Sequence, residues 1–191
     1  MSGLAWVVLL VVVLAVGWYL TYSAARLDRL HARAEGALTA LDAQLVRRAE
    51  ATLELANSGE LDAASSLILA AAASESLERQ TEHLVDGDLL DGVHFGGRES
   101  VESDLTAALT TALTPDVVAQ VRAAGQIGAA DLERIEAAAI RVQLARRFHN
   151  NAVTDVRRVR EKGVVRLFRL AGHAPLPETV EFDDTVPGVR R

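Results

Sequence analysis

Hydrophobic positions are unbroken over residues 4–20, where no charged side chain interrupts the run. At 1.5 Å rise per residue, a helix from about Leu4 to Tyr22 covers roughly 28 Å, close to the hydrocarbon thickness of a bilayer. Trp6 lies near one end of this run and Trp18 near the other, where amphipathic rings favour the headgroup level. The pattern predicts one membrane-spanning helix and disfavours a core helix of a soluble domain.

The charges on either side of this helix predict its orientation. The segment 1–3 carries no Lys or Arg, whereas Arg26, Arg29 and Arg33 follow the helix. By the positive-inside rule, the short N-terminus lies outside and the rest of the chain is cytoplasmic. We therefore expect a single-pass cell-membrane protein. A cleaved signal peptide is the alternative, and the missing positive charge before the run disfavours it.

After Tyr22 the pattern changes to an amphipathic helix. Leu and Ala recur at spacings of three and four from Leu27 to Ala49, which places them on one stripe. The first breaker is Asn57-Ser58-Gly59. The membrane helix is therefore expected to continue without interruption to about Ala56.

Further helices are expected over about 60–85, from Glu99 onwards, and over about 129–162. Between them, glycines and aspartates over 86–97 predict a loop, and Thr114-Pro115-Asp116 predicts a helix restart or kink. Short connections make neighbouring helices antiparallel. The predicted fold is all-α, a transmembrane helix continuous with an elongated antiparallel three- to four-helix bundle.

Three regions follow from these patterns. Residues 1–22 form the short external N-terminus and the transmembrane helix, and residues 23–172 form the cytoplasmic bundle. Residues 173–191 contain Ala174-Pro175-Leu176-Pro177 and an acidic stretch. This composition predicts an extended, disordered tail.

Composition excludes several kinds of chemistry. The 191 residues include no cysteine, so disulfides and thiolate nucleophiles are absent. The net charge of −6 argues against nucleic acid as a partner. Only 4% of the residues are aromatic while half are hydrophobic, which suits helices packed through Ala and Leu.

No catalytic, cofactor-binding or metal-binding constellation is evident. The five histidines, at 31, 83, 94, 149 and 173, form no His-x-x-x-His or His-Glu-x-x-His pair. Gly96-Gly97 lacks the spacing of a phosphate loop, Ser65-Ser66 has no neighbouring base, and Glu133 with Glu136 lacks the histidine of a carboxylate metal centre. We expect His149 to be a partly buried or surface side chain and predict no catalysis and no cofactor.

Basic residues gather at the end of the last long helix, as Arg157, Arg158, Arg160 and Lys162. An antiparallel return places them near the membrane, and residues 164–170 mix apolar side chains with two more arginines. This favours contact with anionic lipid. The alternative is a solvated helix face that complements the helix dipole.

Three stretches, in order along the chain, resemble the LemA family of bacterial membrane proteins. Residues 41–48 are similar to its Asp-x-Gln-Leu-x-x-Arg run, residues 140–153 to its Ala-Arg-x-x-Tyr-Asn-x-Ala-Val pattern, and Leu167-Phe168 with Ala174-Pro175 to its tail. His149 replaces the tyrosine, and the family's Leu-Ile-Pro after the double arginine is absent. The resemblance implies a divergent member with an N-terminal span and a helical bundle, and it implies no established reaction.

These observations predict a membrane-anchored, non-enzymatic scaffold or adaptor with protein partners. Self-association through the Leu/Ala stripes stays open. The alternatives are an envelope-associated enzyme, whose groups only the tertiary structure would assemble, and a lipid-organising protein that uses the basic end of the last helix.

Overall fold

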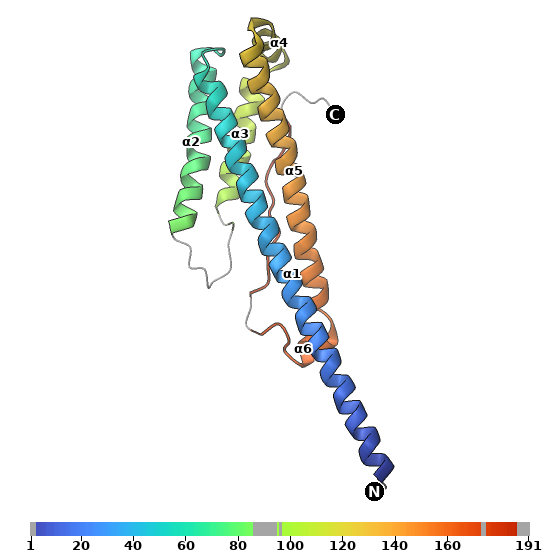
Figure 1. Ribbon diagram of the computed structural model, residues 1–191. Coiled ribbons are helices and arrows are strands. Elements are labelled where there is room, and N and C mark those ends of the chain that lie inside the picture. Colours follow the sequence, from blue (N-terminus) through green and yellow to red (C-terminus); the bar gives the residue numbers. More distant parts are fainter. Residues whose placement is uncertain (1–2, 86–94, 96, 173–174, 187–191) are drawn as a thin grey trace.

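The computed structural model describes residues 3–85, 95, 97–172 and 175–186. Within these ranges the regular structure is all helical, and no strand is present (Figure 1). The helices are α1 (Gly3–Asn57), α2 (Ala63–Val85), α3 (Arg98–Ala112), α4 (Pro115–Ala124), α5 (Gln126–Arg160) and α6 (Gly163–Leu167). The predicted all-α bundle with a long N-terminal helix is confirmed.

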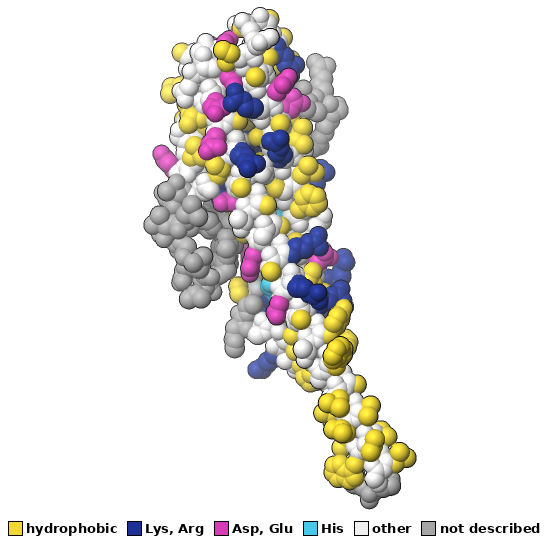
Figure 2. Space-filling view, in the orientation of Figure 1, with side chains coloured by type: hydrophobic (Ala, Val, Ile, Leu, Met, Phe, Trp, Pro, Cys, Tyr) yellow, Lys and Arg dark blue, Asp and Glu magenta, His cyan; other side chains and the backbone are white. Residues whose placement is uncertain are grey.

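α1 is one helix of 55 residues with two different surroundings. Its first part is exposed on all sides and covered with hydrophobic side chains (Figure 2), and burial begins at Leu27. It is the one helix, among the described residues, that is long and apolar enough to cross a membrane. The expected continuation to about Ala56 is confirmed because α1 ends at Asn57.

α5 runs antiparallel to α1 along the part of that helix that follows the apolar run (Figure 1). Near the exposed end of α1, Leu27 and Ala34 share a core cluster with Val153 and Val156 of α5. Farther along the pair, Leu41 and Leu45 pack with Val142, and Leu55 lies in a cluster with Ile135. These apolar residues of α1 and α5, placed at helical spacing, are therefore buried in the core that the two helices share.

α2, α3 and α4 enlarge the end of the bundle that lies farthest from the N-terminus (Figure 1). α2 packs on α1, and α3 packs on α2, with Leu69, Ala73, Leu105 and Leu109 fully buried between them. α4 is a separate short helix that packs on α5. Thr114 caps it, since the Thr114 hydroxyl accepts the Val117 amide at 3.4 Å. The predicted restart at this threonine is confirmed.

Some expected boundaries differ from the observed ones. α2 begins at Ala63 and not at about Glu60, because the Asp62 carboxylate accepts the backbone N–H groups of Ala64 and Ser65 and so caps the helix. α5 begins at Gln126 and not at about residue 129, so Gly128 lies in its first turn. Of the expected loop over 86–97, residues 86–94 and 96 lie outside the described residues.

The expectation for the tail is wrong in one respect. Residues 175–186 are extended, as predicted, but they are not disordered, since Val180, Phe182 and Val186 are buried. They lie between α3 and α5, against α1 (Figure 1). Alternating apolar side chains face the core, which proline content and acidic charge alone did not indicate.

Candidate functional site

A charged side chain lies in the core of the bundle, on the apolar stripe of α1. Arg48 is 1% exposed, and its guanidinium donates to the Glu102 carboxylate at 2.8 Å, to the Glu102 carbonyl at 3.0 Å and to the Thr106 hydroxyl at 2.9 Å. Glu102 and Thr106 belong to α3. A buried charge requires such partners because water is excluded. Arg48 therefore joins α1 to α3.

The second Glu102 oxygen extends the network. It accepts the Ser76 hydroxyl of α2 at 2.8 Å and Arg98 Nε at 3.2 Å, and Arg98 also pairs with Asp42 of α1. Two arginines and two carboxylates thus form an electrically balanced cluster. Since the members of this cluster lie on α1 and α3 and bond to one another and to Ser76 of α2, the cluster holds three helices together.

Aromatic rings cover this buried network. Phe182 of the tail stacks near Phe95, with ring centroids 6.3 Å apart and planes 17° apart. The Arg48 guanidinium lies 6.0 Å from the Phe182 centroid, and that of Arg146 lies 5.6 Å from it. Such cation–π contacts are strengthened where the cation is desolvated. The tail is therefore part of the cover over the core charges.

His149 of α5 is 3% exposed and connects the tail to α1. Its Nδ1 lies 3.3 Å from the Ala34 carbonyl oxygen, and its Nε2 lies 3.1 Å from that of Glu178. His149 is buried, and not partly buried or at the surface as expected, and backbone carbonyls are its neighbours. In the described part of the chain, both ring nitrogens contact backbone carbonyls, so the arrangement positions the tail and is not a nucleophile–base pair.

The four basic residues predicted for lipid contact fall into two pairs. Arg157 Nε donates to the Pro177 carbonyl at 3.0 Å, and Arg160 donates to the Pro175 carbonyl at 2.8 Å. Arg158 is 72% exposed at its side chain, with Asp155 3.8 Å away, and Lys162 is exposed. Two of the four therefore hold the tail, and two face solvent.

α6 and the turn after it lie against the part of α1 that follows the apolar run. Val165 is buried in a cluster with Leu27, against which Leu30 packs. On the outer side, Leu167 is 76% and Phe168 49% exposed. Their neighbours Arg166 and Arg169 are also exposed. This short segment presents apolar and basic side chains together.

A line of exposed apolar side chains runs along the outer side of α5. Ile140, Leu144 and Phe148 are spaced four apart and are 43%, 47% and 61% exposed. Residues four apart lie above one another on a helix. We call these three residues the α5 stripe. Exposed arginines at 141 and 147 flank it.

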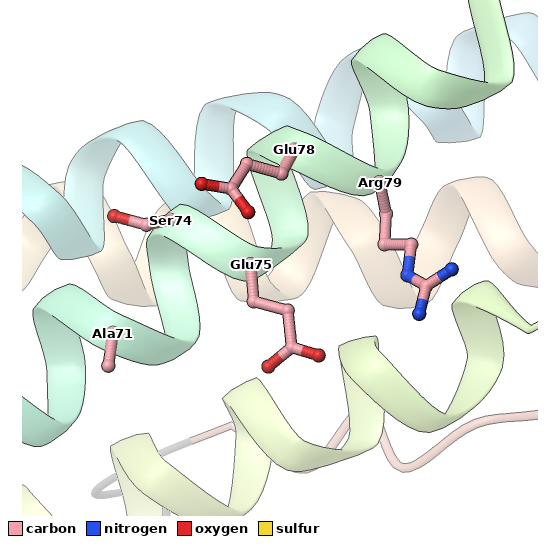
Figure 3. Close-up of a pocket in the computed structure, with 5 residues that line it drawn as sticks. All are labelled: Ala71, Ser74, Glu75, Glu78 and Arg79. Atoms are coloured by element: carbon pink, nitrogen blue, oxygen red, sulfur yellow. The ribbon is translucent and has the colours of Figure 1, made fainter.

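A hollow on α2 is open to solvent. Ala71, Ser74, Glu75, Glu78 and Arg79 line it, and Glu75 extends toward α3 (Figure 3). Among the described residues, no group of three or more His, Asp or Glu side chains is placed to hold a metal ion. The side chains at 83, 94 and 173 lie outside the described part.

The remaining candidates from the sequence occupy structural positions. Ser65 lies in the first turn of α2, where its amide bonds Asp62. Glu133 is exposed and Glu136 half-buried on α5. The structure brings none of these together with another candidate.

Sequence reasoning missed the charge network and the tail contacts. One signal was available, because Arg48 interrupts an apolar stripe between Leu45 and Thr52. A second was the alternation of Val180 and Phe182 with acidic residues. No family model, curated protein or solved structure matches this chain.

Proposed function

We propose that this chain is a membrane-anchored, non-catalytic scaffold that holds a stiff helical bundle at the cytoplasmic surface for partner proteins. The observation that carries the proposal is the continuity of α1. The same helix supplies the exposed apolar segment and, from Leu27 onwards, the core of the bundle. Because no linker separates them, the anchor fixes the orientation of the domain.

Membership of the LemA family is part of this proposal, and the placement of the resembling residues supports it. Asp42 and Arg48, from the first resembling stretch, are both in the buried charge network. Arg146 and Asn150, from the second, both bind the tail. The two stretches that resemble the family are far apart in the sequence, but their residues lie in the same region of the bundle, around the charge network and the tail.

The orientation is proposed from the charges that follow the apolar run. Arg26, Arg29 and Arg33 lie just after it, and the exposed Arg158 and Lys162 return to the same level along α5. Positive charge at this level favours the cytoplasmic side.

The absence of cysteine makes the orientation easy to test. A single cysteine at exposed Ser58, at the far end of α1, should react with a membrane-impermeant maleimide only after cells are permeabilised. A cysteine at Ser2 should react in intact cells. Labelling of Ser58→Cys in intact cells would overturn the cytoplasmic placement, and loss of the segment carrying Ser2→Cys would indicate cleavage.

The α5 stripe supports a protein partner. An exposed apolar line on a helix suits a helix or groove of another protein, and flanking arginines favour an acidic rim on it. Proximity labelling from a C-terminal tag in intact cells should mark cytoplasmic or cytoplasm-facing proteins. The variant Leu144→Asp/Phe148→Asp should lose the main labelled species.

The control is Leu67→Asp on α2, where the leucine is 71% exposed and outside the stripe. It should leave the labelled set unchanged. If all variants label the same proteins, the α5 stripe does not bind the partner. If only external proteins are labelled, the bundle is not cytoplasmic.

We infer a second role in lipid contact from the position of α6. Leu27, which packs with Val165, follows Tyr22 by five residues, or about 7.5 Å along the helix. The headgroup layer on each side of a bilayer is about 5–8 Å thick. Leu167, Phe168 and the exposed arginines beside them therefore lie at headgroup level, where apolar and basic side chains bind anionic lipid.

A probe on Leu167 tests this role in the full chain. Leu167→Cys carrying an environment-sensitive fluorophore should shift to the blue in nanodiscs with phosphatidylglycerol, and less so with phosphatidylcholine alone. Arg166→Glu/Arg169→Glu should reduce the shift, as should high salt. The same probe at Ser58 is the control. If the probe at residue 167 shows no blue shift in nanodiscs with anionic lipid, the proposed lipid contact is wrong.

A further inference from the structure

The tail segment, residues 175–186, is bound as an extended peptide between two helices. It lies between α3 and α5 (Figure 1), and side chains of both helices bind its backbone. We call the residues that contact it the tail groove. They are Glu99, Ser103 and Thr106 of α3, Gln143, Arg146, His149, Asn150, Arg157 and Arg160 of α5, and Leu38, Leu41 and Leu45 of α1 below.

Asn150 makes the most specific of these contacts. Its amide nitrogen donates to the Val180 carbonyl at 3.0 Å, and its amide oxygen accepts the Val180 N–H at 2.9 Å. One side chain thus satisfies both backbone groups of one residue, as a neighbouring strand would in a sheet. From the same helix, Gln143 donates to the Asp184 carbonyl at 2.6 Å.

The opposite wall binds the backbone between these points. Glu99 accepts the Glu181 N–H at 2.6 Å, and Ser103 accepts the Asp183 N–H at 3.1 Å. Thr106 donates to the Asp183 carbonyl at 2.7 Å. The backbone of 180–184 is therefore recognised from both sides, which depends on an extended conformation and not on side-chain identity.

Side chains of the tail supply the specificity. Val180 and Phe182, two apart, are 2% and 9% exposed above the α1 stripe. Arg146 pairs with Asp184 at 2.8 Å and with Glu181 at 3.0 Å. The pattern that the groove reads is therefore apolar–acidic–apolar, followed by an acidic residue two positions later.

Resting on the proposed membrane anchoring, we propose that the tail groove is a peptide-binding site that accepts this tail segment from a second copy of the chain as well as from its own. Every contact above is between the tail segment and the groove, so a tail of the same sequence from a neighbour makes all of them. Exchange of an identical element is a low-cost route to a dimer.

A groove filled by a neighbour's tail is more favourable than a groove that holds no tail. Without Phe182, the ring that covers Arg48 and Arg146 is lost and the charge network is opened to water. Buried polar groups that lose their cover are costly. The two favourable states are therefore the two in which a tail fills the groove, either its own or a neighbour's.

Membrane anchoring makes the neighbour's tail reachable. Two copies held by the same stiff α1 stand parallel, so the tail of one starts at the height where the groove of the other begins. From Leu170, which packs on the bundle, to Pro175 the extended chain spans up to about 17 Å. Packed helices lie about 8–10 Å apart, so this length bridges α5 helices of adjacent copies.

The first test measures the groove alone, with the full chain in nanodiscs that hold one copy. Phe182→Ala weakens the resident tail, and a fluorescent synthetic peptide of residues 175–186 should then bind. Adding Asn150→Ala should weaken binding at least about tenfold, since three hydrogen bonds are lost, two with the Val180 backbone and one with the Glu181 carboxylate. If the peptide does not bind Phe182→Ala that keeps its helical circular dichroism, the groove is not a peptide site.

If Phe182→Ala unfolds, Asp184→Lys replaces it, because that change repels Arg146 and leaves the Phe182 pocket filled. Peptide binding should again rise above that of the unmodified chain. No rise with this variant would equally overturn the proposal.

The second test asks whether copies exchange tails in one membrane. Tagged Phe182→Ala should co-isolate untagged wild-type chain from liposomes, and tagged Phe182→Ala/Asn150→Ala should not. Peptide binding in nanodiscs without co-isolation would overturn the second copy as occupant and assign the site to another protein's segment. Maleimide labelling at Ser58 and partner labelling do not depend on either result, so they report separately on the scaffold proposal.

Discussion

At the scale of single residues, Arg48 shows what a charge in the core requires. Its guanidinium is 1% exposed and bonded to Glu102, which is fully buried. We expect Arg48→Met to lower the free energy of unfolding by about 3–5 kcal/mol, because the change leaves a buried carboxylate short of a partner. Urea unfolding of the full chain in detergent, followed by circular dichroism, measures this.

Arg33 provides the matched control. It also pairs with a carboxylate, that of Asp155 at 3.8 Å, but its side chain is 62% exposed and that of Asp155 is 41% exposed. Arg33→Met should cost less than about 1 kcal/mol, as exposed ion pairs do. Equal losses for the two variants would mean that the Arg48 network contributes no more than a surface pair.

Asp62 predicts a dependence on pH. Hydrogen bonds from the Ser65 side chain and the Ser65 backbone N–H lower the pKa of the Asp62 carboxyl below its ordinary value of 3.8. Because the folded pKa is lowered, the charged cap stabilises the fold above the unfolded value, and this stabilisation is lost as pH falls through the folded one.

The comparison is with Asp62→Asn, which keeps an acceptor but does not titrate. The unfolding midpoint of the wild-type chain should exceed that of the variant near neutral pH, and the difference should shrink at about pH 3. A difference that is the same at both pH values would contradict the stabilising charge.

The sequence predicted the positions of single residues on their helices, but it did not predict their partners. The stripe in α1 predicted the side of the helix on which Arg48 lies, because a helical period places it between Leu45 and Thr52. Its partner could not be predicted, since Glu102 is 54 residues away and meets it only through the packing of α3 on α2. The sequence likewise predicted that Asn150 lies on the last long helix, but no pattern near it in the sequence indicated that it binds Val180.

At the scale of elements, Gly128 controls how closely α4 approaches α5. A Cβ added at this position would lie 2.7 Å from Val121 Cγ1 and 3.2 Å from the Val121 carbonyl oxygen. We expect Gly128→Ala to destabilise the protein by about 1–3 kcal/mol, since the two helices must separate or distort. Thermal unfolding in detergent gives the change.

Gly36→Ala is the opposite case on α1. No atom lies within 4 Å of a Cβ there, and the position is exposed in mid-helix. Alanine should stabilise the helix by up to about 1 kcal/mol through its higher helix propensity. If both substitutions destabilise equally, close packing is not the reason at Gly128.

The elements that were predictable are those with long periodic patterns or strong local signals. α1 and α5 carry apolar stripes over many turns, and Thr114-Pro115 marks a helix start by the chemistry of capping. The tail segment was less predictable, because an extended stretch without helical period obtains its order from the side chains of two other elements. Its acidic residues look solvated in the sequence, but Asp184 pairs with Arg146.

At the scale of the whole molecule, the continuity of α1 predicts the height of the bundle above the membrane. Residues 23–57 rise about 50 Å at 1.5 Å per residue, so Asn57 should stand about that far from the headgroups, less any tilt. α5 stiffens this part of α1 because three core clusters join the two helices along it. Energy transfer from a fluorophore at Ser58 to acceptor lipids should therefore be weak and uniform in nanodiscs.

A flexible insertion separates the contribution of the anchor from that of the bundle. Three Gly-Ser pairs placed between Ser23 and Ala24 leave the core intact, because burial begins at Leu27. The bundle should then tilt freely, so that transfer from Ser58 rises and its distribution broadens, while the melting temperature stays the same. An insertion that changes neither quantity would show that α6 and its neighbouring arginines hold the bundle upright without α1. A wild-type chain with strong transfer would show that the bundle lies on the bilayer, and its α5 stripe would then face lipid instead of a protein partner.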